Sequence, residues 1–495
     1  MHRKLNILMA ASEAVPFAKE GGLADVVSAL SKCLRKMGHD ARIVLPRYYG
    51  VDKARWGLRP VGGPLGVPMG CIGTLWGGVY ETVLPGSDVP VYFIEYEQYF
   101  GRSGGLYTDS YGQGHMDNDN RFVFLSRAAL ELCKVLPFRP DVVHVHDWQT
   151  AAIPVLLNTA YREDHVLREA ASLLTLHNLE YQGDFYKGLM DVLGIGWEHF
   201  NPRELEAHDR TNLLKGGITH ATLLSAVSPT YAREIQTVEL GHALDGVIRD
   251  RAKDFHGILN GADYEEWDPE ADALIPENYS VADLSGKAVC KAELQKRLGL
   301  PVRAEVPLFG VVSRLVSQKG VDVLAAAMPG ILGIDAQVAV LGAGEGWAQA
   351  YFGDLPRSYP RKAACFIGFE NSLAHAIIAG ADFFLMPSRF EPCGLSQLYS
   401  LRYGTPPIVR ATGGLNDTVE NFDEATGKGT GVKFHDLTPD AIMNTVGWAA
   451  HTFYNRKDAL DSLRERGMRQ SFSWEKSAKE YESLYRLAVR RRSGP

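Results

Sequence analysis

The sequence has few cysteines and no long apolar run. Its six cysteines are scattered through 495 residues without a C-x-x-C pair. This spacing argues against a zinc ribbon or a disulfide framework, and it fits a reducing cytoplasm. No apolar run approaches the ~20 residues that cross a bilayer. The short run LNILMAA near the N-terminus stops before Glu13, so we expect a first buried strand rather than a signal peptide. These absences predict a soluble, cytoplasmic protein with no membrane partner.

An excess of positive charge is also missing. The chain holds 52 basic and 59 acidic residues, and its formal net charge is −7. Such a balance gives no global field that would attract nucleic acid, and the terminal RRRSGP is more typical of a solvated tail.

Two nucleotide motifs are absent. There is no G-x-x-x-x-G-K-[ST], which disfavours a P-loop kinase or ATPase, and no G-x-G-x-x-G follows the first strand. The nearest imitation is GAGEG at 342–346, whose spacing is incomplete. A nicotinamide enzyme is therefore disfavoured, and we expect no cofactor.

Alternating strand and helix patterns fill both halves of the chain. LNILMAA predicts a strand, LADVVSALSKCLRKMG an amphipathic helix with Gly38 beyond its end, and ARIVLP a second strand. DVVHVHD, SLLTLHN and TLLSAVS continue as strands. From about residue 306 the alternation restarts with PLFGVVSRL, AQVAVLGAG, AACFIGF, DFFLMPS and TPPIVRAT as strands.

The stretch between the halves, NGADYEEWDPEADALIPENYS, is rich in acidic residues, glycine and proline, as expected around a hinge. The pattern predicts an α/β protein of two doubly wound domains, with ligands at the carboxyl ends of the strands.

Two possible metal motifs have simpler interpretations. Asp117–Asp119 (DND) resembles a D-x-D metal motif, but it stands just before the helical RFVFLSRAALELC, which favours a helix N-cap. His144 and His146 share a face of the strand DVVHVHD, but no third ligand is nearby in the sequence. We expect no metal at either place.

Three stretches of the second half place polar groups after strands. Arg314 and Lys319 in SRLVSQKG could clamp a diphosphate, or could be solvated surface cations. Glu391 in PSRFEPCGLSQLYSLRYG precedes a helix that we expect to begin near residues 395–396, so it could bind a ligand or serve only the helix dipole. Gly413–Val419 (GGLNDTV) opens a helix with a glycine pair, as GGLADVV does in the first half.

Six motifs occur in a fixed order: KEGGLADV, HVHDW, TLHNLEYQG, SRLVSQKG, PSRFEPCGLSQLY and ATGGLNDTV. Together they resemble bacterial glycogen synthases and the related plant starch synthases. The resemblance implies a GT-B fold, with two Rossmann-like domains facing a deep cleft. Residues 1–255 plus 471–495 would form the acceptor domain, and 256–470 the donor domain. It also implies transfer of glucose from ADP-glucose to the 4-hydroxyl at a non-reducing end of glycogen or another α-1,4-glucan, with retention and without a metal.

The family pattern assigns roles to individual residues of this chain. Arg314 and Lys319 would stabilise the departing diphosphate, and Lys19 would reach it from the other domain. Glu391 would bind the sugar hydroxyls and stabilise charge in the transition state of a front-face departure, while a double displacement stays open on the sequence alone. His177 and Asn260 would contact the glucose, while Asp147 would lie on the acceptor side. The remaining positions implied in substrate binding are Gly21, Gly22, Phe369, Cys393, Gly394, Leu395, Ser396, Tyr399, Gly413 and Gly414.

Three positions depart from patterns common in the family or in the broader transferase group. Glu20 stands where many relatives have threonine, and Phe369 stands where the adenine-stacking position is often tyrosine. Tyr399 replaces the second glutamate of a broader transferase pattern, as in the synthase subgroup. Two rival functions stay open on the residues alone: a GT-B transferase that uses UDP-glucose or a small acceptor, and a non-catalytic glucan-binding protein of the same fold.

Overall fold

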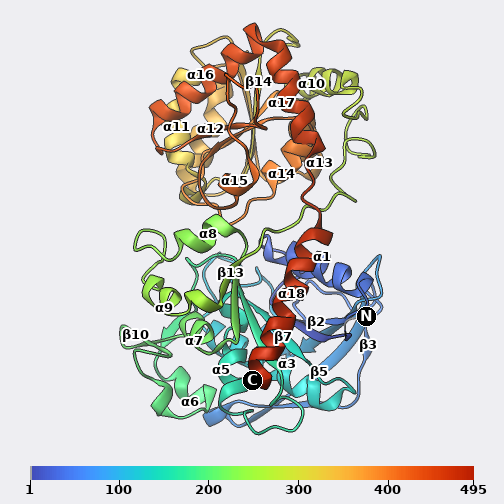
Figure 1. Ribbon diagram of the computed structural model, residues 1–495, viewed down its shortest axis with the longest axis vertical. Coiled ribbons are helices and arrows are strands. Elements are labelled where there is room, and N and C mark those ends of the chain that lie inside the picture. Colours follow the sequence, from blue (N-terminus) through green and yellow to red (C-terminus); the bar gives the residue numbers. More distant parts are fainter. Residues whose placement is uncertain (1–2, 495) are drawn as a thin grey trace. The chain divides into compact units, whose positions relative to one another are not determined.

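The computed structural model describes residues 3–494, which form two compact units. The first unit contains the described residues up to Val227, Ala232–Gly261 and those from Trp474 onward; the second contains Ser228–Tyr231 and Ala262–Ser473. Each unit has a sheet of mainly parallel strands covered by helices, so the predicted α/β class is confirmed (Figure 1). Within residues 3–494, none of the helices combines the length and the apolar character that crossing a bilayer requires.

The sheet of the first unit has its parallel strands in the order β13-β12-β8-β7-β1-β2-β6. In chain order this is 7-6-5-4-1-2-3, so the direction of strand succession reverses between β1 and β7. Ligands of doubly wound sheets bind at the carboxyl ends of the strands beside such a reversal. The bounds are β1 (Asn6–Ala10), β2 (Asp40–Pro46), β6 (Pro90–Glu95), β7 (Val142–His146), β8 (Ala171–Leu176), β12 (Leu223–Ala226) and β13 (Phe255–Gly257).

Antiparallel strands extend the first unit and were not expected from the sequence. They are β3 (Arg59–Pro60), β4 (Leu65–Pro68) and β5 (Thr74–Val83) at the sheet edge, and a separate small sheet of β9 (Asp184–Tyr186), β10 (Glu206–Ala207) and β11 (Arg210–Asn212). The short helices of this unit are α2 (Glu97–Phe100), α4 (Asp147–Thr150), α5 (Ala152–Asn158), α6 (Leu189–Leu193), α7 (Leu213–His220) and α9 (Asp245–Asp250), and α8 (Pro229–Glu234) crosses the boundary between the units.

Three longer helices complete the first unit: α1 (Leu23–Lys36), α3 (Asn118–Val135) and α18 (Trp474–Ser493). Helix α1 matches the prediction, and Gly38 beyond its end is left-handed with φ +92°. Helix α18 packs on α1 and on the sheet at β8 and β7 (Figure 1). The N-cap prediction for α3 is wrong in its chemistry: Asp117 precedes the helix, but its carboxylate accepts a hydrogen bond from Arg102 and caps no backbone N–H.

The sheet of the second unit is parallel throughout, in the order β16-β15-β14-β17-β18-β19. In chain order this is 3-2-1-4-5-6, with the reversal between β14 and β17. The strands are β14 (Leu308–Val312), β15 (Gln337–Gly342), β16 (Ala363–Ile367), β17 (Phe383–Met386), β18 (Pro407–Arg410) and β19 (Val432–Phe434). The helices are α10 (Ser285–Arg297), α11 (Val321–Ile331), α12 (Gly346–Ser358), α13 (Asn371–Gly380), α14 (Ser396–Arg402), α15 (Gly413–Thr418), α16 (Pro439–Asn455) and α17 (Lys457–Arg469).

This sheet is buried on both faces, which explains its unbroken apolar strands. Along β15, Val338 and Val340 join the apolar cluster that includes α11 and α16, while Ala339 and Leu341 join the cluster that includes α10 and α13. Successive side chains of a strand point to opposite faces, so a strand covered by helices on both sides is apolar at every position.

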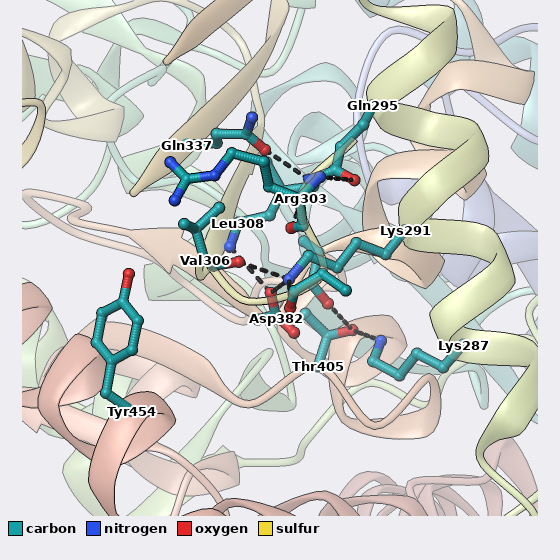
Figure 2. A network of polar contacts seen from close by, with 12 residues as sticks. Lys287, Lys291, Gln295, Arg303, Val306, Leu308, Gln337, Asp382, Thr405 and Tyr454 are labelled. Carbon is teal, nitrogen blue, oxygen red and sulfur yellow. Dashed lines mark hydrogen bonds and ion pairs between the residues drawn. The ribbon is translucent and has the colours of Figure 1, made fainter. Parts of the chain in front are cut away.

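A polar network fastens α10 to the amino ends of the strands (Figure 2). Lys287 Nζ donates to the Thr405 hydroxyl at 2.6 Å and to two backbone carbonyl oxygens, and burial holds the pKa of Lys287 well below its usual range. Lys291 forms an ion pair with Asp382 at 2.7 Å, and Asp382 also accepts from the backbone N–H of Leu308. Because ligands lie at the opposite, carboxyl edge of such a sheet, we assign this network to stability.

Candidate functional site

In the first unit, polar groups gather in the loops that follow β1 and β7. The buried carboxylate of Glu13 accepts hydrogen bonds from the backbone N–H groups of Glu20, at 2.6 Å, and Gly21, at 2.9 Å. The hydroxyl of Tyr107 donates to the same carboxylate at 2.5 Å. Glu13 therefore fixes the course of the glycine loop, a role that was not predicted.

The glycine loop presents an exposed cation. Lys19 Nζ forms an ion pair with Asp25 at 2.8 Å, and the Lys19 side chain is 53% exposed. Gly21 and Gly22 are exposed, and a Cβ atom added to either would meet nothing within 4 Å. The loop thus leaves its backbone open to a ligand, with Lys19 beside it.

Asp147 directly follows β7, and its side chain is hydrogen-bonded to the backbone that follows β8. It is a buried, non-glycine residue in the left-handed region, with φ +49°, and its carboxylate accepts from the backbone N–H of His177 at 2.6 Å. Burial raises the pKa of Asp147 to about 7, against the opposing effect of the hydrogen bonds from the backbone N–H groups of His177 and Asn178. A residue held in this sparsely populated conformation is typical of a functional site.

Three histidine rings lead inward from this point. His177 Nε2 lies 3.0 Å from His146 Nδ1, and the rings of His146 and His144 have centroids 4.2 Å apart. Burial lowers the pKa of His177 to about 3 and lowers the pKa values of His144 and His146 well below their usual range, so the rings are neutral near pH 7. His144 lies within hydrogen-bond distance of Tyr485 Oη at 2.8 Å and Thr175 Oγ1 at 2.6 Å, so both its ring nitrogens are occupied.

Several buried polar side-chain atoms of the first unit have no hydrogen-bond partner among residues 3–494. His146 Nε2 and Asn260 Oδ1 are two of them, and Asn260 is only 6% exposed. Such atoms are costly unless a ligand or water satisfies them. This fits the predicted involvement of Asn260 in ligand binding.

In the second unit, the reversal between β14 and β17 brings together Lys319 and Glu391. Lys319 Nζ lies 2.5 Å from Glu391 Oε2, which also accepts from the Ser388 hydroxyl at 3.0 Å. The side chains are 18% and 7% exposed, respectively. A small pocket beside the pair is lined by Ser313, Pro387 and Lys319 among others. Lys319 follows β14 and Glu391 follows β17, so this pairing depends on the strand order.

Arg314 lies in the same loop as Lys319 but is exposed, and it donates to Gln318 Oε1 at 3.1 Å. The structure adds Arg389, which the sequence reasoning did not single out. Its side chain donates to the carbonyl oxygen of Ser317 and pairs with Asp322 on α11, while its backbone N–H donates to the Gln318 carbonyl. Arg389 thereby holds the Lys319 turn against the segment that carries Glu391.

The Gly413–Gly414 pair is packed against the segment that carries Glu391. A Cβ atom at Gly414 would lie 2.1 Å from the carbonyl oxygen of Cys393, and Gly413 has φ +45°. The backbone N–H of Gly414 donates to the Glu391 carbonyl at 3.1 Å. The two glycine pairs thus differ, since Gly21 and Gly22 face open space whereas Gly413 and Gly414 allow two backbone segments to touch.

The other predicted positions lie on and around α14 and after β16. Gly394 is left-handed (φ +73°), Leu395 precedes α14 and Ser396 begins it, as expected. The ring of Tyr399 stacks on Trp267 with centroids 4.3 Å apart, and Trp267 stacks in turn on His375 at 3.7 Å. Phe369 is 83% exposed after β16, so its ring is available for stacking.

Each unit therefore carries polar groups at the carboxyl ends of the strands beside its own reversal. The second unit presents cations and a carboxylate beside glycine-rich turns, which suits a phosphorylated sugar compound. The first unit presents a cation on an open loop and neutral imidazole and amide groups, which suit sugar hydroxyls.

Family models match both parts of the chain. The model described as starch synthase catalytic domain matches residues 6–250, and the model described as glycosyl transferases group 1 matches residues 295–451. Glycogen synthase 1 of Geobacter metallireducens is 60% identical over 492 residues, covering 99% of this chain and 98% of its own. Glycogen synthase of Treponema denticola is 44% identical and covers 99% of both chains.

Solved structures agree with these matches. The catalytic domain of starch synthase IV from Arabidopsis thaliana, bound to ADP and acarbose, superposes with a TM-score of 0.90 at 33% identity, covering 98% of this chain and 100% of that one. Sucrose-phosphate synthase from Thermosynechococcus elongatus superposes with a TM-score of 0.59 at 16% identity over 98% and 99% of the two chains, a likeness of fold alone. The fold is the GT-B architecture of glycosyltransferases.

Proposed function

Because the chain belongs to the glycogen and starch synthase family, we propose that it transfers glucose from ADP-glucose to the 4-hydroxyl at the non-reducing end of an α-1,4-glucan, with retention of configuration. The observation that carries this proposal is the Lys319–Glu391 pair at the strand reversal of the second unit. The starch synthase IV structure contains ADP, which is a nucleoside diphosphate, and acarbose, which is an oligosaccharide analogue. We therefore assign an adenine nucleotide sugar as donor and a glucan as acceptor to this chain because of its similarity to that protein.

The second unit would bind the donor. Breaking the glycosyl–phosphate bond leaves negative charge on the diphosphate, and stabilising that charge is the main electrostatic task. Lys319 is held by Glu391 before the donor binds, while Arg314 is exposed and can turn toward a phosphate. Phe369 would stack on the adenine, and the packed Gly413–Gly414 turn would keep the segment of Glu391 in place.

Glu391 suits charge stabilisation better than nucleophilic attack. Its carboxylate is neutralised by an ammonium group 2.5 Å away and accepts a hydrogen bond from Ser388, and both contacts lower its nucleophilicity. In the proposed step the bond from glucose C1 to the diphosphate oxygen breaks while the bond from C1 to the acceptor O4 forms on the same face. The proton of the 4-hydroxyl passes to the departing phosphate oxygen.

The first unit would bind sugar. His177 is neutral, so its ring can exchange hydrogen bonds with a hydroxyl without carrying charge, and Asp147 fixes the backbone that presents it. Asn260 offers a buried oxygen that lacks a partner among the described residues. Lys19 stands on the open glycine loop and would add a cation for the donor phosphates.

Radiolabelled glucose transfer to glycogen tests the proposal. We expect incorporation from ADP-glucose, with the new linkages cut by an enzyme specific for α-1,4 bonds. A preference of more than tenfold for UDP-glucose would overturn the donor assignment. Glucan binding without any transfer from either donor would instead point to the non-catalytic alternative.

A further inference from the structure

We propose that His199, Glu204 and His220 form a binding site for a divalent transition metal ion, with Zn²⁺ the best-suited ion. The three side chains lie in the first unit, outside the groups that follow β1 and β7. One potential ligand atom from each residue lies within 4.8 Å of the other two. His199 ends the short helix at Trp197–His199, Glu204 lies in the next loop, and His220 is the last residue of α7.

The three ligand atoms lie almost as they would around a bound metal ion. Glu204 Oε2 lies 2.6 Å from His199 Nδ1 and 2.9 Å from His220 Nε2, so both rings point at one carboxylate oxygen. An ion 2.0–2.1 Å from each ligand in a tetrahedron separates ligand atoms by about 3.3 Å. The distances from Glu204 Oε2 to the two imidazole nitrogens therefore need to lengthen by about 0.7 and 0.4 Å to admit an ion.

The carboxylate is oriented by further contacts. Asn201 Nδ2 donates to Glu204 Oε1 at 3.1 Å, which leaves Oε2 for the imidazole rings. Lys215 on α7 donates to the carbonyl oxygens of Pro202 and Glu206, on either side of Glu204. Such outer contacts hold ligands in place and raise metal affinity.

The chemistry of the three groups suits the same ion. Two imidazoles and a carboxylate are a ligand set that Zn²⁺ accepts, with a water molecule in the fourth position. The side chains are 12–24% exposed, which permits entry of the ion.

Calorimetric titration of the full-length protein, stripped with EDTA and titrated with Zn²⁺, tests the site. We expect one ion per chain and a rise in the unfolding temperature of about 5 °C at 100-fold excess over the dissociation constant. Co²⁺ in the same site should give the intense visible absorption of a four-coordinate ion.

Glu204→Gln and His199→Asn should weaken Zn²⁺ binding at least tenfold and abolish the Co²⁺ absorption, and both retain hydrogen-bonding groups that favour a folded protein. His165→Ala, which changes an exposed histidine elsewhere in the first unit, should leave both signals unchanged. Equal binding by the wild type and both ligand variants would overturn the proposal. So would the absence of Zn²⁺ binding by the wild type, in which case the cluster is a hydrogen-bonded group only.

Discussion

Variants of the Lys319–Glu391 pair can show whether the pair stabilises the second unit through its charges or only through packing. The two side chains are largely buried and their charged atoms are 2.5 Å apart. Removing one partner of such a pair leaves an uncompensated charge at a cost of about 3 kcal/mol. We therefore expect Glu391→Gln and Lys319→Met each to lower the free energy of unfolding of the second unit by about 3 kcal/mol. The double variant should lose less than the sum, with a coupling of about 2 kcal/mol.

Native-state hydrogen exchange of peptides that cover β14 and β17 measures these changes within the second unit. Asp335→Asn removes a partner of Arg303 from an exposed ion pair in the same unit and should leave the exchange close to that of the wild type. Strictly additive losses from the two single variants would refute the coupling.

The same two variants should change the affinity for ADP in opposite directions. In Glu391→Gln the ammonium of Lys319 loses its carboxylate partner and is left for the diphosphate, so ADP should bind several-fold more tightly although glucose transfer is lost. In Lys319→Met the affinity should fall about tenfold, because one charge-assisted contact is removed. Isothermal titration with ADP measures both. If ADP binding weakens equally in the two variants, Glu391 does not compete with ADP for the ammonium group of Lys319.

Three further predictions concern the two units separately. Gly414→Ala forces a methyl group against the Cys393 carbonyl, so we expect a loss of about 1–3 kcal/mol in urea unfolding together with a lower transfer rate. The pKa of Asp147 is raised to about 7, so its protonated form stabilises the folded state, and the wild type loses this stabilisation as the pH rises from about 4 to 7. Asparagine does not titrate, so the stability of Asp147→Asn relative to the wild type should increase between pH 5 and pH 8 in urea titrations. Tyr485→Phe leaves His144 Nδ1 without its partner and should cost about 1–3 kcal/mol of unfolding free energy.

Matched controls sharpen these tests. Gly21→Ala adds a methyl group in open space and should leave urea unfolding unchanged, while Tyr49→Phe removes a hydroxyl from a residue that is 65% exposed and should do the same. If Gly414→Ala or Tyr485→Phe unfolds like its control, the contact that it removes contributes nothing measurable. A constant stability difference between Asp147→Asn and the wild type over pH 5–8 would contradict the raised pKa.

Much of the fold follows from the sequence because buried parallel strands are continuous apolar runs. The strands around Leu308–Val312 and Phe383–Met386 lie where the pattern predicts them. The end of α1 shortly before Gly38 was also predictable, since it depends on neighbouring residues alone, whereas the close backbone contacts of Gly413 and Gly414 were not. Two of the antiparallel edge strands were missed because β3 has only two residues and β4 only four, whereas the longer β5 has Gly77 and Gly78 in its middle, which weaken the strand pattern.

Contacts within the site could not be predicted, because they depend on strand order. Lys319 and Glu391 were both expected at strand ends, but they meet only because β14 and β17 are neighbours, although 70 residues separate the two strands' segments in the chain. From the sequence, Glu13 is only the residue that ends an apolar run. The metal ligands were missed for a similar reason, since a search for closely spaced histidines finds His144 and His146 but not His199 and His220.

The return of α18 to the first unit has a consequence for synthesis on the ribosome. His144 lies within hydrogen-bond distance of Tyr485, 341 positions later, and the ribosome synthesises the whole of Ala262–Ser473 after His144 and before Tyr485. A nascent chain that emerges from its N-terminus can complete the second unit first, while the first unit lacks its final helix. The domain that begins the polypeptide is therefore the last to close its core, and a chain truncated near its end would damage the half that was translated earliest.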